Sequence, residues 1–341
     1  MSESVTGRYE LGDFKLQSDS VLKDAFIGFR SYGSLNESRD NVIVFPTWYT
    51  GLNNQVEPYI GPGKALDPNK YFIVIPDMFT NGSSTSPSNA QDIHKGLNFP
   101  LVTPFDNVRA QRRLLEENFG ITSVELMVGF SMSGQQAYHW AALHSDLVKR
   151  ACSICGTSKT SPHNWAMLHA YKASMETSQD WPAKSCDDWD PKVLNVFASI
   201  GATMAMSQDW YRDGLHLTEG VAGVSDVIEN IKGLFRPWIP ANIYAQTLTW
   251  MSADVSNNST FNGSMESALR AIEIPFLMLP CETDLYFRVE DNKGELPFIS
   301  NGHLNVIKSR SGHMAGLPGF SSEDDEFITN QLIEFLRAPC R

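Results

Sequence analysis

A serine stands at the junction of two sequence patterns in the stretch VGFSMSGQQAYHW, residues 128–140. The residues before Ser131 read as the end of a buried strand, and those after it read as a helix. A strand–Gly-x-Ser-x–helix turn strains the serine backbone and lifts its hydroxyl above the edge of a sheet. Small residues flank such a turn because a Cβ there would meet the neighbouring strand or helix. This pattern predicts that Ser131 attacks an acyl carbon as a nucleophile.

The exit of this turn carries Ser133 in place of the more usual second glycine. We interpret Ser133 as a tolerated small residue. The alternative is that its hydroxyl points into a substrate pocket and takes part in acyl binding.

A serine hydroxyl is a weak nucleophile and needs a base that an acid holds in place, in the chain order Ser, acid, His. Of the eight histidines, His313 lies in the glycine-rich stretch SRSGHMAGLPG, between the last predicted strand and the last predicted helix. The acid should follow the preceding strand, where IPFLMLPCETDLYF offers Glu282 and Asp284, with Asp291 further along. We favour Asp284, because the Leu-Tyr-Phe that follows it could hold its carboxylate.

Two backbone amides must stabilise the oxyanion of an acyl-transfer intermediate. Met132, the residue after the nucleophile, offers one. The turn FPTWYTG after an early strand offers the other, which we assign to Tyr49, with its neighbour Trp48 as the alternative. No metal-ligand cluster, phosphate loop or dinucleotide fingerprint accompanies these residues, so we expect neither a metal nor a cofactor.

Alternating strand and helix patterns predict an α/β fold with a mostly parallel central sheet flanked by helices. The segment 156–269 breaks the alternation, because it is mostly helical and rich in tryptophan and methionine. We expect residues 1–155 and 270–341 to form the core and 156–269 to form an inserted helical lid over the carboxyl ends of the strands. Cys152 and Cys155 fall in a predicted buried strand, where residues three apart point to opposite faces. That placement disfavours a redox or zinc pair.

The net charge of −12 and the sequence pI near 5.1 argue against nucleic acid and anionic membranes as partners. No apolar run is long enough to cross a membrane. The start of the chain does not read as a secretory signal and the five cysteines are odd in number, so we expect a cytoplasmic protein with reduced thiols. The expected partner is a small molecule, and a homodimer through the lid is left open.

These stretches together resemble the homoserine O-acetyltransferase family of the α/β-hydrolase superfamily. The likeness extends over nearly the whole chain, is weakest in the lid, and includes VGFSMSGQQ, TWYTG, DMFTNGSSTSPSN, FPLVTPFDNVRAQ, TDLYF and SGHMAG. The resemblance implies an α/β-hydrolase fold, Ser131 as nucleophile, Asp284 as acid, His313 as base, and Tyr49 and Met132 as oxyanion donors. It therefore agrees with the assignment made from the residues themselves.

Two departures from that family bear on the substrate. Met314 stands where the family has an aspartate that holds the homoserine ammonium, and the lid has no clear counterpart of the arginine that holds the homoserine carboxylate. A zwitterion would lie unpaired in such a site. The sequence therefore resembles an esterase-type branch of the family, and it predicts a serine hydrolase that cleaves carboxylic esters with short or medium acyl groups.

Two other functions stay open. One is an O-acyltransferase that uses acetyl-CoA or another acyl thioester as co-substrate and acts on a hydroxyl other than that of homoserine. The other is a protein of this fold that binds a ligand without covalent catalysis.

Overall fold

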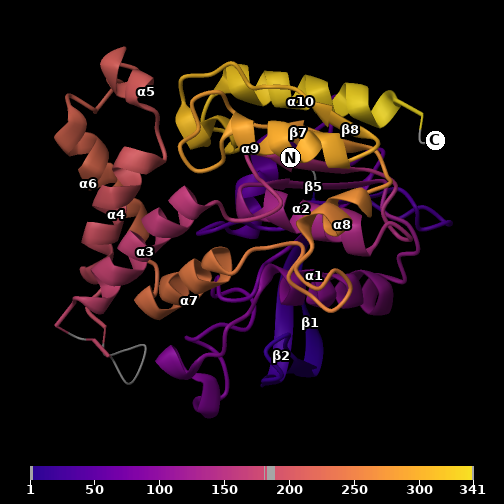
Figure 1. The fold of residues 1–341 in the computed structure, drawn as a ribbon, viewed down its shortest axis with the longest axis horizontal. Coiled ribbons are helices and arrows are strands. Elements are labelled where there is room, and N and C mark those ends of the chain that lie inside the picture. The colour runs from indigo at the N-terminus through magenta and orange to yellow at the C-terminus, as the bar shows by residue number, and fades with distance from the viewer. Residues whose placement is uncertain (1–2, 180, 183–188, 340–341) are drawn as a thin grey trace.

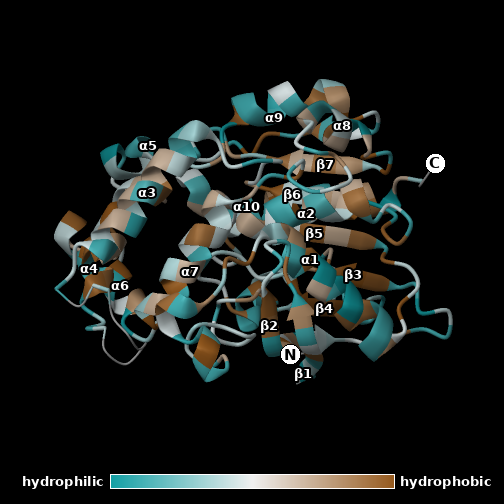
Figure 2. Cartoon of the chain, turned by 60° about the horizontal axis from the view of Figure 1, so that its bottom comes forward, coloured by the Kyte–Doolittle hydropathy of each residue, from teal (hydrophilic) through white to brown (hydrophobic). Residues whose placement is uncertain are grey.

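The computed structural model describes residues 3–179, 181–182 and 189–339. In this part of the chain an eight-stranded sheet has the order β1-β2-β4-β3-β5-β6-β7-β8 (Figures 1 and 2). β1 and β2 form an antiparallel pair, β2 is antiparallel to β4, and the other neighbours are parallel. The strands are β1 Ser4–Lys15, β2 Val21–Tyr32, β3 Val42–Val44, β4 Phe72–Pro76, β5 Leu126–Phe130, β6 Ala151–Ile154, β7 Phe276–Leu279 and β8 Gly302–Leu304.

Both faces of the central strands are buried, which explains why these segments are continuously apolar. In β3, Val42 and Val44 join the apolar cluster on one face, and Ile43 joins the cluster on the other. Side chains alternate between the two faces of a strand, so each face needs its own layer of helices.

The helices around the sheet supply those two layers. α1 (Pro104–Arg113), α2 (Met132–Leu143) and α8 (Met265–Arg270) contribute to the first cluster, and α10 (Ser322–Arg337) contributes to the second. Thr103 caps α1 together with Asp106, each side chain accepting a hydrogen bond from the backbone of the other. α9 (Val289–Glu295) lies between β7 and β8 in the chain.

Five helices between β6 and β7 gather at one end of the molecule (Figure 1). A third apolar cluster, here called the lid cluster, joins side chains of four of these helices, all except Gln208–Arg212, to Tyr49, Met132 and Tyr286, which follow β3, β5 and β7. The cluster therefore packs these helices against segments that follow the parallel strands. They are α3 Pro162–Glu176, α4 Val193–Met204, α5 Gln208–Arg212, α6 Val224–Phe235 and α7 Pro240–Met251.

The structure confirms the predicted fold class, a mostly parallel sheet flanked by helices. β8 ends at Leu304, and beyond it Ile307 forms a bridge to Cys281. The division into a core of 1–155 and 270–341 and a lid of 156–269 stays a prediction.

The prediction that Cys152 and Cys155 point to opposite faces was wrong. Both side chains are buried in the same apolar cluster. Cys155 lies one residue beyond β6 with a φ of 46°, so the alternation of the strand no longer applies to it. Both thiols are free, as expected, and so is that of Cys281. Cys186 and Cys340 lie outside the described residues.

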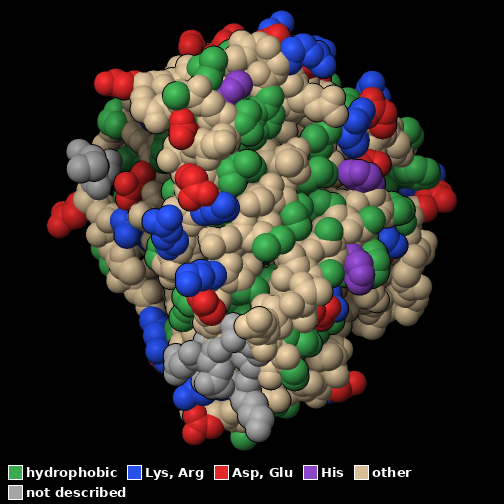
Figure 3. Space-filling model, turned by 90° about the vertical axis from the view of Figure 1, so that its left-hand side faces the viewer, with side chains coloured by type: hydrophobic (Ala, Val, Ile, Leu, Met, Phe, Trp, Pro, Cys, Tyr) green, Lys and Arg blue, Asp and Glu red, His purple; other side chains and the backbone are tan. Residues whose placement is uncertain are grey.

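The lid side of the molecule faces the viewer in Figure 3, where hydrophobic side chains lie among charged ones. Large apolar residues exposed on the lid include Val196, Leu217 and Leu234. Among the described helices, none combines the length and the apolar character needed to cross a membrane. The homodimer through the lid stays a prediction.

Candidate active site

The turn between β5 and α2 holds Ser131 in a strained conformation. Ser131 has a φ of 60° and a ψ of −125°, a region that side-chain-bearing residues rarely adopt. Glycine is required just before it, because a Cβ on Gly129 would lie 2.2 Å from the carbonyl oxygen of Ser133. A Cβ on Gly134 would lie 2.7 Å from the Oγ of Ser153 on β6. The small residues therefore allow α2 to start directly against the sheet.

Ser133 uses its hydroxyl within the turn. The backbone N–H of Phe130 donates to the Oγ of Ser133 over 2.8 Å, and the same hydroxyl donates to the carbonyl of Phe130, also over 2.8 Å. Ser133 is completely buried. This pairing gives a structural reason for a serine at the exit of the turn, and a pocket role for Ser133 stays a prediction.

The three residues predicted to form a triad lie together. The Nε2 of His313 is 2.9 Å from the Oγ of Ser131, and the Nδ1 of His313 is 2.7 Å from the Oδ2 of Asp284. All three are almost fully buried, with Ser131 only 3% exposed. They come from three loops at the same edge of the sheet, after β5, β7 and β8. The geometry is that of a nucleophile, a base and an orienting acid.

The two alternative acids lie elsewhere. Glu282 is a partly exposed side chain that pairs with Lys308 over 2.9 Å. Asp291 lies on α9 and lines a separate cavity, and partial burial raises the pKa of its carboxyl group. Asp284 alone is held by its own loop: its Oδ1 accepts hydrogen bonds from the backbone N–H groups of Tyr286 and Phe287 over 2.7 and 3.2 Å. The Leu-Tyr-Phe segment thus holds the carboxylate through its backbone.

The turn after β3 carries the second predicted oxyanion donor. The N–H of Gly51 donates to the carbonyl of Trp48, which makes Trp48–Gly51 a tight turn with Tyr49 at its first corner. The amides of Thr47 and Thr50 are also occupied, by Pro76 and by the side chain of Gln246. Among the described residues, the backbone N–H groups of Trp48, Tyr49 and Met132 donate no hydrogen bond to another protein group. Either Trp48 or Tyr49 can therefore provide the second oxyanion donor.

The side chains of Trp48 and Tyr49 point to different environments. The ring of Trp48 packs against Phe130 in the cluster on the sheet face, at 5.4 Å between centroids. Tyr49 belongs to the lid cluster, where its ring lies 5.2 Å from that of Trp250. Burial raises the pKa of the Tyr49 hydroxyl well above its usual range.

Aromatic rings surround the imidazole of His313. Phe130 stacks on it at 4.8 Å between centroids, and Tyr286 meets it edge-on, also at 4.8 Å. The lid holds the histidine loop from the other side, because the carbonyl of Ala205 accepts from the backbone N–H groups of His313 and Met314. These contacts fix the position of the base.

Within the part of the chain that the structure describes, no arginine of the predicted lid is placed to hold the carboxylate of an amino acid substrate. Met314 is a half-buried apolar side chain directly after His313. The two arginines of the predicted lid, Arg212 and Arg236, are both exposed, and Arg212 pairs with Asp209. Neither arginine is buried beside the triad.

One set of groups at the triad has the composition of a metal site. The ligating atoms of Cys155, Asp284 and His313 all lie within 4.8 Å of one another. Burial and the nearby carboxylate of Asp284 raise the pKa of the Cys155 thiol well above its usual range. Because a metal binds the thiolate, this protonated thiol is a poor ligand. The absence of a metal from the reaction stays a prediction.

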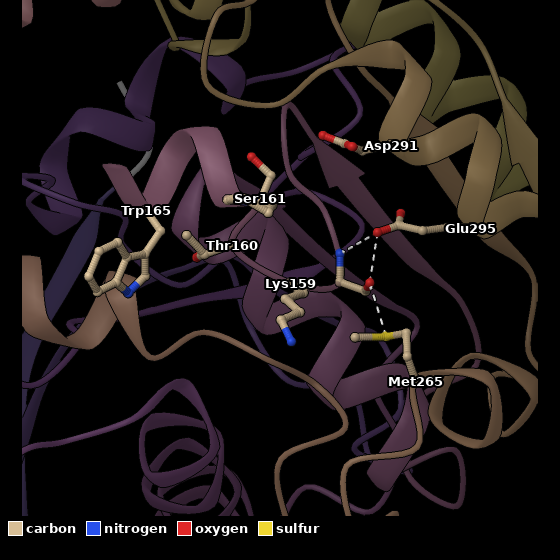
Figure 4. Close-up of a pocket in the computed structure, with 9 residues that line it drawn as sticks. Lys159, Thr160, Ser161, Trp165, Met265, Asp291 and Glu295 are labelled. Carbon is tan, nitrogen blue, oxygen red and sulfur yellow. Dashed lines mark hydrogen bonds between the residues drawn. The ribbon is translucent and has the colours of Figure 1, made fainter. Parts of the chain in front are cut away.

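A separate open cavity of about 560 Å³ lies beside the start of α3 (Figure 4). Asp291 and Glu295 project toward it from α9, opposite Ser161 and Trp165. The carboxylate of Glu295 already accepts hydrogen bonds from the backbone and the hydroxyl of Ser158. Asp291, the most distant of the three candidate acids, lines this cavity, whereas Ser131, Asp284 and His313 do not.

The sequence did not indicate which polar side chains hold residues 47–51, the turn that carries the second predicted oxyanion donor and is here called the oxyanion turn. Gln246, 196 residues along the chain from Thr50, binds its amide, and the side chain of Gln136 donates to the carbonyl of Thr47. No motif near residues 47–51 indicates either glutamine. Gln246 lies on α7 and Gln136 lies on α2, and these helices contact the turn only in the folded chain.

Comparisons with known proteins agree with this architecture. A family model described as alpha/beta hydrolase fold matches residues 40–320. The ethyl acetate hydrolase of Pseudomonas veronii is 32% identical, over 99% of this chain and 98% of that protein. The homoserine O-acetyltransferase of Nostoc punctiforme is 26% identical, over 92% of this chain and 94% of its own length.

Among solved structures, an acetylester hydrolase from Corynebacterium glutamicum is similar to this chain with a TM-score of 0.93 and 30% identity. The match covers 98% of this chain and 96% of that one. The resemblance stated from the sequence is confirmed.

Proposed function

Because the chain belongs to the α/β-hydrolase family, within its homoserine O-acetyltransferase-like and esterase branch, we propose that it is a cofactor-free carboxylic ester hydrolase working through an acyl-enzyme. The single observation that carries the proposal is the continuous hydrogen-bonded line from Asp284 through His313 to Ser131. The similarity to an ethyl acetate hydrolase and an acetylester hydrolase supports ester hydrolysis.

The proposed reaction runs in two halves. His313 Nε2 accepts the proton of Ser131 as the oxygen attacks the ester carbonyl, and it then delivers that proton to the departing alcohol. The acyl group is left on Ser131. A water molecule then attacks it and gives a proton to the same nitrogen, which returns that proton to the Ser131 oxygen as the carboxylic acid is released. Asp284 keeps the proton of His313 on Nδ1 and stabilises the imidazolium that forms in each half. The amides of Tyr49 and Met132 stabilise each oxyanion.

The surroundings of Ser131 favour esters with short acyl groups over medium ones. Ser131 is almost fully buried, and Tyr49, Met132 and Tyr286 of the lid cluster pack around the same strand ends. An uncharged ester fits such a lining, whereas the ammonium and carboxylate of homoserine would enter it unpaired, at a cost of several kcal/mol per ion. We therefore propose that homoserine is not the acceptor.

A paired assay tests this proposal against acyl transfer. Ethyl acetate is offered alone and the released acid is measured; acetyl-CoA is offered with homoserine, and free thiol and O-acetylhomoserine are measured. The proposal predicts hydrolysis of ethyl acetate and negligible O-acetylhomoserine. Efficient O-acetylhomoserine formation would contradict it. Thiol release that requires a different alcohol would replace it with an acyltransferase acting on that alcohol.

A further inference from the structure

The turn that carries Tyr49 contains a strained residue directly after it. Thr50 has a φ of 59°. A β-branched residue with positive φ is an outlier, and it persists only where the surroundings hold it in place. Gly51 closes the turn and must be glycine, because a Cβ there would lie 2.9 Å from the ring of Trp48.

Gln246 on α7 holds this strained residue. Its Oε1 accepts a hydrogen bond from the backbone N–H of Thr50 over 2.7 Å, and its Nε2 donates to the carbonyl of Thr80 over 3.1 Å. The side chain of Gln246 is completely buried. It therefore joins the lid to two loops at the carboxyl edge of the sheet, the turn after β3 and the segment after β4.

The next residue of α7 holds the side chain of Tyr49. The hydroxyl of Thr247 donates to the carbonyl of Ile243 over 2.9 Å, so the Tyr49 hydroxyl is the donor in the 2.8 Å bond to Thr247 Oγ1. α7 lies between the outer lid helices and the sheet in Figure 2. Consecutive residues of this helix thus fix both the backbone and the side chain of the oxyanion turn.

We propose that Gln246 is a positioning residue for ester hydrolysis, because it locks the Trp48–Gly51 turn so that a backbone amide faces the oxyanion. This inference rests on the proposed function. Without the Gln246 acceptor, the partly buried N–H of Thr50 loses its partner, and the strain at Thr50 is no longer opposed. The turn then relaxes, and the peptide that carries the amide of Tyr49 rotates with it.

The experiment compares two substitutions on α7. Gln246→Met keeps the buried volume but removes both hydrogen bonds to the loops. Asn242→Leu, one turn earlier, removes a similar buried pair, in which the Asn242 side chain bonds to Ser88. Steady-state hydrolysis of a short-chain ester is measured for each variant, together with the thermal midpoint of unfolding. The number of Ser131 sites that react with a fluorophosphonate is also counted.

Gln246→Met is expected to lower kcat about 10- to 100-fold, less than the roughly 10²- to 10³-fold loss caused by removing an oxyanion donor outright, because the amide is misplaced and not removed. KM should change little, because ground-state binding does not use the turn amide. Asn242→Leu is expected to leave kcat within about threefold of the wild type, since Ser88 lies outside the turn and a change away from the transition state does not act on kcat. Complete fluorophosphonate labelling of a variant shows that its nucleophile is intact, so an unexpected kcat would then contradict this inference alone. Absence of labelling in the wild type would instead contradict the proposed function.

Thr50→Gly provides the rescue, because glycine adopts a positive φ without strain. Added to Gln246→Met, it should restore part of the lost kcat. Thr247→Val removes the hydrogen bond that holds the Tyr49 hydroxyl, and it should also lower kcat with little change in KM. This variant replaces Gln246→Met as the test if Gln246→Met does not fold. Equal losses in Gln246→Met and Asn242→Leu, or a loss that Thr50→Gly leaves untouched, would overturn the inference.

Discussion

The carboxylate of Asp284 divides its two oxygens between His313 and its own loop. Oδ2 lies 2.7 Å from the Nδ1 of His313, while Oδ1 accepts from the amides of the two residues after Leu285. The carboxylate is therefore fixed before any substrate arrives. Because it can only accept hydrogen bonds, it holds the proton of His313 on Nδ1 and leaves Nε2 to act as the base.

The first prediction follows from that arrangement. Asp284→Asn preserves the shape of the side chain but offers His313 an amide that can donate, which favours the wrong tautomer. Turnover of a short-chain ester should fall roughly 10³- to 10⁴-fold with the fold retained, as judged by circular dichroism. Glu282→Gln is the matched control and should alter turnover by less than about twofold, since it removes a surface ion pair. Reversed results would move the acid to Glu282.

The second prediction concerns the glycine before the nucleophile. A Cβ at Gly129 meets the backbone of Ser133 at 2.2 Å, and backbone atoms at the start of a helix cannot move aside cheaply. Gly129→Ala should lower the free energy of unfolding by about 1–3 kcal/mol, as overpacked positions do, and should abolish ester turnover. Gly294→Ala on α9 meets nothing within 4 Å and should be neutral or slightly stabilising. Urea denaturation of the two variants decides the question, and an unaffected Gly129→Ala protein would contradict the packing account.

The third prediction distinguishes the two possible roles of Ser133, a structural role within the turn and a role in the acyl pocket. Removing its hydroxyl by Ser133→Ala leaves the buried N–H of Phe130 without its partner. The free energy of unfolding should fall by about 1–3 kcal/mol, while KM for a short-chain ester stays unchanged. A rise in KM at unchanged stability would instead favour the acyl-pocket role.

The fourth prediction is a dependence of stability on pH. Burial first, and then the charge of Arg112, lower the pKa of His144 from 6.5 to about 4. The unfolded chain therefore binds one proton more than the folded chain between these values. The free energy of unfolding should fall as the pH is lowered from about 6.5 to about 4.

His144→Gln tests this contribution, because it removes the titrating group. The variant should lose less stability than the wild type over that pH range, measured by urea denaturation at several pH values. His163→Gln, which removes an exposed imidazole, is the control and should follow the wild type. Parallel curves for the wild type and His144→Gln would contradict the prediction.

The fold and the triad could be predicted because their signals are local. Apolar segments marked the central strands, and the order of Ser131, Asp284 and His313 along the chain, each in a loop after a strand, placed them at one edge of the sheet. The turn around Ser131 could be predicted for the same reason, since Gly129 avoids a clash with Ser133, four residues along the chain.

The features that were not predicted depend on distant parts of the chain. Gln246 meets Thr50 only because α7 packs against the turn after β3. Cys155 approaches Asp284 only because the chain takes a positive φ directly after β6.

The central claim is that Ser131 is the nucleophile, and intact-mass measurement after treatment with a fluorophosphonate tests it most directly. The wild-type protein should gain the mass of one adduct. The rate of labelling should fall sharply in His313→Ala, because the hydroxyl loses its base. Ser131→Ala should gain no adduct. An adduct that survives Ser131→Ala at the wild-type rate would contradict the account.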